Sequence, residues 1–262
     1  MAITLKTPEQ IERLRDAGRI VAETYEVLRP HILPGVTTAE LDRIAEEYIR
    51  SKGAIPKYKG FGALNDRRGH MLRPPFPASI CVAINDVICH GIPSSRQLLR
   101  DGDIIGIDIG TVYKGWIGDS CKTFAVGKVD KASQKLMDVA LRCLEIGIEQ
   151  AQPGKRLGDI GAAIQEYAEG NGYSTVRELY GHGVGRELWE EPTVPHFGTA
   201  GTGIVIRPGM VFTIEPMINA GKAGIQQMPD QWTIKTADGS RSAQYEHTLA
   251  IFDDGPQLLT VV

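Results

Sequence analysis

The chain repeats a short pattern at a fixed distance, and this repeat limits the folds that it can adopt. Pro34-Gly35 leads into a segment that contains Glu47-Tyr48. Pro153-Gly154 leads into one that contains Glu166-Tyr167, and both pairs are separated by 119 residues. A chain built from two copies of one unit is predicted to fold as two related halves, packed about a pseudo-twofold axis.

A second, shorter offset locates an insertion in the first copy. Arg100 precedes Asp108 by eight residues, and Arg207 precedes Glu215 by the same distance, so these pairs are 107 residues apart. The first copy therefore carries about twelve extra residues, which we place in the proline- and arginine-rich stretch LNDRRGHMLRPPFP, residues 64–77. Because nothing resembling a linker separates the copies, we predict one domain over 1–262, with halves of about 7–127 and 128–255.

Apolar spacing predicts helices followed by strands in each half. Thr7-Pro8-Glu9-Gln10 has the form of a capping box with proline at the first helical position, and apolar residues continue at helical spacing to Leu28. Further helices are predicted from Thr37, over 131–150 and over 157–169. Strands are predicted for SICVAIN and for the hairpin GIDIGTVYKGWIGD, residues 106–119. The order predicts an α+β fold with a curved antiparallel sheet covered by helices.

Composition excludes several classes of partner. Hydrophobic and charged residues make up 42% and 23% of the chain, which is typical of a soluble globular protein. The net charge of −3 gives no reason to expect a nucleic-acid or membrane partner, and no apolar run approaches a membrane span. The cysteines have no CxxC spacing and the N-terminus lacks an apolar signal segment, so we expect a cytoplasmic monomer with reduced thiols.

Two carboxylates lie within the apolar pattern of the predicted hairpin. Asp108 and Asp119 are eleven residues apart, so a turn at Tyr113-Lys114 would place them directly opposite each other on one face, about 5 Å apart. Ionised carboxylates in this arrangement repel, and burying them is costly unless they are paired. Either a shared proton or a divalent cation would relieve the repulsion.

The second half of the chain favours the cation. Glu215 lies in VFTIEPM and Glu246 in AQYEHTLAIF, again as acids within apolar strands. By the duplication, Glu215 corresponds to Asp108 and Glu246 to Asp119. Four carboxylates cannot share protons comfortably, whereas two divalent cations would neutralise them. Two metals about 3.5–4 Å apart are the arrangement used by hydrolases that activate water.

Two histidines are candidates to join these acids. His182 has glycine on both sides, which leaves room for a bound ion or ligand, and His90 also precedes a glycine. Imidazole together with carboxylates suits Co, Mn, Fe or Zn and argues against Mg or Ca.

These residues lie in motifs that resemble the type I methionine aminopeptidase family in its bacterial form. The matching stretches are CHGIP (89–93), GHGVGR (181–186), EEPTV (190–194), RPGMVFTIEPM (207–217) and SAQYEHT (242–248). The resemblance covers nearly the whole chain, from about residue 7 to 251, and implies the pita-bread fold. It implies a dinuclear site with the ligands Asp108, Asp119, His182, Glu215 and Glu246, in which Asp119 and Glu246 bridge both metals.

The resemblance also implies an activity. Members of the family remove the initiator methionine from nascent polypeptides whose second residue is small, which makes these N-termini the expected partners, with the ribosome as one place of encounter. A hydroxide bridging the two metals would attack the peptide, and Glu215 would carry its proton. His90 would hydrogen-bond the reacting peptide, and Cys81 and Trp232 match residues that line the methionine pocket.

The chain departs from the family pattern beside this pocket. Typical members have a pair such as Phe-His before the EEP motif, where this chain has Leu188-Trp189. Trp189 thus stands where the family has a second catalytic histidine, and we expect it to contact the substrate there. Arg73-Pro74 stand where Tyr and His are usual. Two alternatives remain: an aminopeptidase of the Xaa-Pro type, and a pita-bread protein that only binds its partner.

Overall fold

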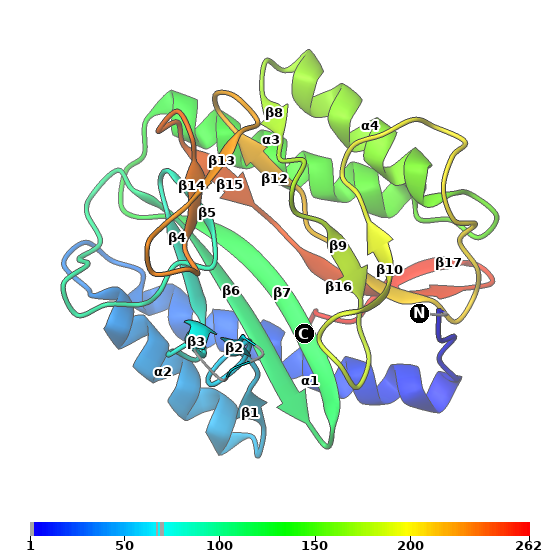
Figure 1. Cartoon of the computed structure of the whole chain (residues 1–262), viewed down its shortest axis with the longest axis horizontal. Helices are drawn as coiled ribbons and strands as arrows, with labels where there is room; N and C mark the ends of the chain where they lie inside the picture. The colour runs from blue at the N-terminus through cyan, green and yellow to red at the C-terminus, as the bar shows by residue number, and fades with distance from the viewer. Residues whose placement is uncertain (1–2, 67, 69–70) are drawn as a thin grey trace.

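The computed structural model describes residues 3–66, 68 and 71–262 and has the predicted α+β organisation, with helices on the outside of antiparallel strands (Figure 1). Arg67, Gly69 and His70 of the predicted insertion lie outside the described residues. No helix of the described chain combines the length and the apolar character that a membrane crossing requires.

The helices begin and end close to the predicted positions. They are α1 (Pro8–Leu28), α2 (Thr38–Ser51), α3 (Lys131–Gln150) and α4 (Leu157–Gly170), with a short 3-10 turn η1 (Arg29–His31) after α1. The Thr7 side chain and Gln10 form the expected capping box, and the Thr37 hydroxyl accepts from the backbone N–H of Glu40. Each pair of helices buries most of its apolar face on the strands of its own half, and Ile11 and Leu14 at the start of α1 belong to a cluster that includes residues of both halves.

The strands are divided among several antiparallel sheets. The first half supplies the sheet β1 (Ile55–Pro56), β4 (Cys81–Ile84), β6 (Ile104–Tyr113) and β7 (Trp116–Ala125). The second half supplies β9 (Gly181–Gly183), β10 (Glu190–Val194), β11 (Val211–Ile214), β16 (His247–Phe252) and β17 (Gly255–Leu258).

Smaller sheets complete the fold. One contains β8 (Ser174–Thr175), β12 (Met217–Asn219) and β15 (Ser242–Gln244). Another combines β5 (Val87–Cys89) from the first half with β13 (Ile225–Gln227) and β14 (Ile234–Thr236) from the second. The insertion forms a ribbon of β2 (Leu64–Asn65) and β3 (Met71–Arg73).

The register of the β6–β7 hairpin corrects one sequence prediction. The turn lies at Lys114-Gly115, both with positive φ (50° and 77°), and not at Tyr113-Lys114. Asp119 therefore pairs with Gly110, while Asp108 pairs with Cys121. A two-residue hairpin turn with positive φ at both positions favours glycine, which explains the shift. Since side chains alternate with a period of two, Asp108 and Asp119 still share a face, as diagonal neighbours.

Hydroxyl side chains join the two halves along β7. Thr123 Oγ1 donates to the carbonyl of Gln244 (2.6 Å) and accepts from the Gln244 backbone N–H (3.1 Å). Ser120 Oγ donates to the Glu246 carbonyl (2.5 Å), and Thr248 Oγ1 donates to the Asp119 carbonyl (2.7 Å). These bonds fix the backbone of Asp119 and Glu246 relative to each other.

Equivalent contacts recur in the two halves. An isolated bridge joins Thr37 to Leu98, and another joins Arg156 to Val205, at positions related by the offsets of 119 and 107 residues. We infer that the halves, about 7–127 and 128–255, are copies of one unit within a single domain.

We expect Thr123→Val to lower the free energy of unfolding by about 2–4 kcal/mol, because it leaves both the N–H and the C=O of the buried Gln244 without their partner. Chemical denaturation monitored by circular dichroism would measure this. Thr4→Val, at an exposed position, is the control and should change stability by less than about 0.5 kcal/mol. Equal stabilities of the two variants would contradict this role of the hydroxyl.

Candidate active site

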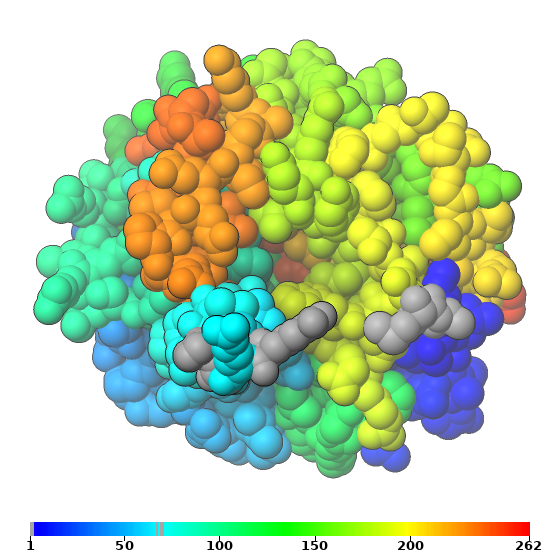
Figure 2. All heavy atoms as spheres, in the orientation of Figure 1, coloured from blue at the N-terminus to red at the C-terminus, as the bar shows by residue number. Residues whose placement is uncertain are grey.

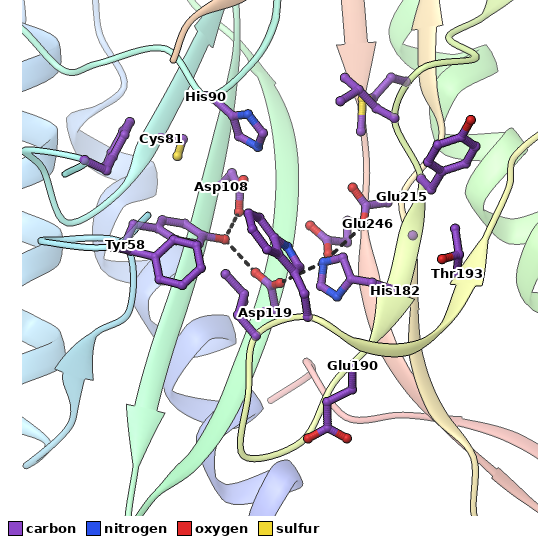
Figure 3. A pocket seen from close by; sticks show the side chains of 18 of the residues that line it. Tyr58, Cys81, His90, Asp108, Asp119, His182, Glu190, Thr193, Glu215 and Glu246 are labelled. Carbon is purple, nitrogen blue, oxygen red and sulfur yellow. Dashed lines mark hydrogen bonds and ion pairs between the residues drawn. The ribbon is translucent and has the colours of Figure 1, made fainter. Parts of the chain in front are cut away.

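The acids predicted from the sequence converge in one cleft (Figure 3). Asp108 projects from β6 and Asp119 from β7, whereas His182 comes from β9. Glu215 follows directly after β11, and Glu246 lies between β15 and β16. Both halves of the chain therefore contribute carboxylates to the same point.

His182 lies among these carboxylates at distances that suit a shared ion. Its Nε2 atom is 3.7 Å from Asp119 Oδ2 and 3.5 Å from Glu215 Oε1. One ligand atom each from Asp119, His182 and Glu246 lie within 4.8 Å of one another. His182 Nδ1 lies 3.1 Å from the Gly183 carbonyl, which assigns the ring proton to Nδ1 and leaves Nε2 free to bind a cation.

Burial makes ionisation of this cluster unfavourable. Loss of water raises the pKa of Asp108, Asp119, Glu215 and Glu246, and for Asp108 and Glu246 the next cause is the charge of Asp119. Burial lowers the pKa of His182, which favours its neutral imidazole. A neutral imidazole among acids that require positive charge is the electrostatic environment of a cation site.

Further residues, which the sequence interpretation did not single out, hold Glu215 in place. Thr213 Oγ1 donates to Glu215 Oε1 (2.8 Å), and Gln244 Nε2 approaches Glu215 Oε2 (3.3 Å). The buried His196 accepts the Glu215 backbone N–H at Nε2 (3.0 Å). Thr213, on β11, and Gln244, on β15, each precede an acid by two residues. Because side chains along a strand alternate between its faces, this spacing could have identified them. No comparable signal marks His196.

The metal-site candidates line a cleft of about 400 Å³ whose other walls are largely apolar. Cys81, on β4, pairs with Asp108 in the sheet register, and both Cys81 and Trp232 are buried in the cleft wall. Phe76 packs edge-to-face on Trp232, with ring centroids 5.2 Å apart. Figure 2 shows the mouth as a hollow between the segments coloured cyan, orange and yellow-green. The cleft can therefore take an apolar side chain beside the acids.

His90 faces the same cleft from the end of β5. Its φ of +56° is a left-handed conformation, which is uncommon for a non-glycine residue and is found at functional sites. Burial, followed by the nearby charge of Arg73, lowers the pKa of His90 to about 4. At neutral pH the ring is uncharged and offers one donor and one acceptor.

Trp189 stands at the mouth of the cleft, with 51% of its surface exposed. Its ring packs edge-to-face on Phe61 (5.0 Å between centroids) and lies 6.4 Å from the His182 ring. The next residue, Glu190, accepts from the backbone N–H of Arg186 and pairs with Lys6 Nζ at 2.5 Å. These bonds anchor the backbone beside Trp189, which places the indole at the mouth of the cleft.

The comparison with known proteins agrees with this geometry. The model of metallopeptidase family M24 matches residues 12–253. The chain is 45% identical over 262 residues to the methionine aminopeptidase of Escherichia coli (strain K12), covering 100% of this chain and 95% of the relative. It is 46% identical to methionine aminopeptidase 1 of Bacillus subtilis (strain 168), covering 99% and 100%.

Solved structures give the same result. The methionine aminopeptidase of Thermotoga maritima superposes with a TM-score of 0.93 at 38% identity, over 100% of both chains. The prolidase of Pyrococcus horikoshii has a TM-score of 0.73 at 22% identity and is covered over 63% of its length, which is a likeness of fold alone. The predicted pita-bread fold is confirmed, and the chain belongs to metallopeptidase family M24.

Proposed function

We propose that this chain is a metal-dependent methionine aminopeptidase, which removes the N-terminal methionine from polypeptides whose second residue is small. The observation that carries the proposal is the convergence of four carboxylates, of which Asp119, Glu215 and Glu246 are buried, with the imidazole of His182 in one largely apolar cleft. Full-length relatives that carry this name support it.

The donor set fits two divalent cations. The ligands would be Asp108, Asp119, His182, Glu215 and Glu246, with Asp119 and Glu246 shared between both cations. Two cations would offset the four negative charges that burial makes costly. Oxygen and nitrogen donors suit Co, Mn, Fe or Zn. When bound, such cations make a coordinated water acidic near neutral pH and polarise a carbonyl group.

Glu215 is the proton carrier in this proposal. Its carboxylate is oriented by Thr213 and Gln244, and its backbone is fixed by His196. A carboxylate held beside the attacking water can accept its proton and deliver it to the leaving amine.

Three other residues would bind the substrate. His90, neutral and facing the cleft, can donate a hydrogen bond to the reacting peptide. Cys81 and Trp232 offer a buried wall for the methionine side chain, whose sulfur packs favourably on aromatic rings. The free α-amino group of the substrate would bind at the cation site, which limits cleavage to the first residue.

The setting of the enzyme is also a proposal. We propose a cytoplasmic monomer that acts on nascent chains, including those emerging from the ribosome, and that binds neither nucleic acid nor membranes. The net charge of −3 is in keeping with this.

Substrate choice tests the function directly. We expect the purified chain, stripped of metal and reloaded with Co, Mn, Fe or Zn, to release methionine from Met-Ala-Ser, with little cleavage of Met-Lys or Ala-Pro-Ala peptides. Amino-acid analysis of the products would measure this. Preferential release of residues ahead of proline would move the chain to the Xaa-Pro class, and binding without cleavage would indicate a binding protein.

Removing one shared ligand tests the dinuclear site. We expect Asp119→Asn or Glu246→Gln to prevent stable binding of two cations and to lower kcat at least about 100-fold, because the remaining charge no longer balances both cations. Metal content after gel filtration and steady-state kinetics would measure both effects. An Asp119→Asn variant that kept two metals and normal turnover would refute the mechanism.

The tryptophan at the mouth provides a third test. Indole donates one hydrogen bond but cannot carry a proton, whereas a positioned acid–base group contributes about 10²–10⁴-fold. The indole N–H of Trp189 already supplies a hydrogen-bond donor, so histidine would add only part of this factor. We therefore expect Trp189→His to raise kcat by about tenfold while changing KM less. Kinetics on Met-Ala-Ser would measure both constants, with Trp189→Phe as the control for packing. If phenylalanine matches the wild type and histidine gives no gain, this position does not limit catalysis.

A further inference from the structure

A buried tyrosine lies directly against the aspartates of the proposed metal site. Tyr58 Oη is 2.5 Å from Asp108 Oδ1 and 2.6 Å from Asp119 Oδ1 (Figure 3). Among the residues that the structure describes, it is the one hydroxyl side chain in hydrogen-bond contact with these carboxylates. One atom therefore touches both aspartates that β6 and β7 present to the cleft.

The hairpin is shaped to receive this ring. Gly110 lies opposite Asp119 in the register, and a β-carbon at Gly110 would come within 2.8 Å and 2.9 Å of the Tyr58 ring atoms Cε1 and Cζ. The backbone N–H of Lys57 donates to the Gly110 carbonyl (2.8 Å), which holds the tyrosine's neighbour on β6. Glycine at 110 thus opens the space through which the phenol reaches the acids.

The hydrogen bonds of Tyr58 orient the carboxylates of Asp108 and Asp119. Asp119 presents Oδ1 to the hydroxyl of Tyr58, which leaves Oδ2 facing His182 Nε2 at 3.7 Å. A phenol oxygen carries one proton and accepts at its lone pairs, so it can donate to either aspartate in turn. Carboxylates that bind metals are commonly held by such outer partners, and loss of a partner costs about 10–100-fold in metal affinity or activity.

We propose that Tyr58 is a positioning residue for the cation site, whose hydroxyl orients Asp108 and Asp119 for metal binding. The inference rests on the proposed function, since it assumes that these aspartates are ligands. The tyrosine itself is not a ligand in this scheme, because its hydroxyl is engaged by the carboxylates. Its effect is on cation affinity and coordination geometry, and through them on turnover.

Tyr58→Phe tests the hydroxyl alone, because the ring and its packing on Gly110 and Phe76 are retained. We expect the affinity of the metal-free chain for Co²⁺ and Mn²⁺, measured by isothermal titration calorimetry, to fall about 10–100-fold. The visible absorption spectrum of the cobalt-loaded variant should also change, since the orientation of two ligands changes. Gly110→Ala, which would displace the ring, should lower the affinity in the same direction.

Tyr25→Phe is a matched control from the opposite face of the same hairpin. Tyr25 is also buried, and its hydroxyl contacts the carbonyls of Ile107 and Ser120 and no carboxylate. We expect this variant to lose thermal stability but to keep the wild-type cation affinity and cobalt spectrum. A purely structural role for Tyr58 predicts that both variants behave alike in the titration.

The outcomes separate this inference from the function on which it rests. If wild type and Tyr58→Phe bind Co²⁺ with equal affinity and give the same spectrum, the positioning role is wrong and the metal site stands. Tighter binding by Tyr58→Phe would also overturn the inference, because the hydroxyl would then compete with the cations. A wild-type chain that binds no cation would overturn the metal site and this inference together.

Discussion

Buried negative charge is the constraint to which the rest of this structure is fitted. Asp108, Asp119, Glu215 and Glu246 lie where two halves of the chain meet, away from water that would stabilise their ionised forms. A fold can tolerate such a cluster if each acid is fixed and its charge is neutralised, either by a proton or by a cation. The hydroxyls of Ser120, Thr123 and Thr248, which tie β7 to the second half, meet the first requirement for Asp119 and Glu246. The cations of the proposed function would meet the second.

The duplication explains why the charge lies at the seam. A strand that carries an acid in one copy has a counterpart in the other, as Asp108 and Glu215 have at an offset of 107 residues. Packing the copies about a pseudo-twofold axis brings the acid-bearing strands together. His182 belongs to the second copy, and its Nε2 atom lies near Asp119 of the first copy and Glu215 of the second. The site is therefore a property of the pair of halves.

The sequence predicted the helices, the shared face of the aspartates and the convergence of the acids, because capping boxes, period-two alternation and the repeat are local or internal signals. It misplaced the hairpin turn by one residue, because positive φ at both turn positions favours Lys114-Gly115 over the Tyr113-Lys114 turn that direct opposition of the aspartates requires. It could not predict Tyr58, which lies 50 residues before Asp108 in an irregular stretch after β1. Such a contact depends on the path that a loop takes across the sheet. Neither secondary-structure propensity nor hydrophobic periodicity predicts that path.

The inserted segment, residues 64–77, contributes directly to the wall of the cleft. Arg73 of β3 lies over the Trp232 ring (4.4 Å), and Trp232 Nε1 donates to the Pro74 carbonyl (2.9 Å), so the inserted segment braces the wall of the proposed methionine pocket. At the mouth, Phe61 packs on Trp189 from the other half. A histidine at 189 would be smaller than the indole and would offer less ring surface to Phe61. Residues 73, 74 and 189 therefore line or support one side of the cleft, and this wall extends to the acids, because Phe76 of the inserted segment packs on both Trp232 and Tyr58.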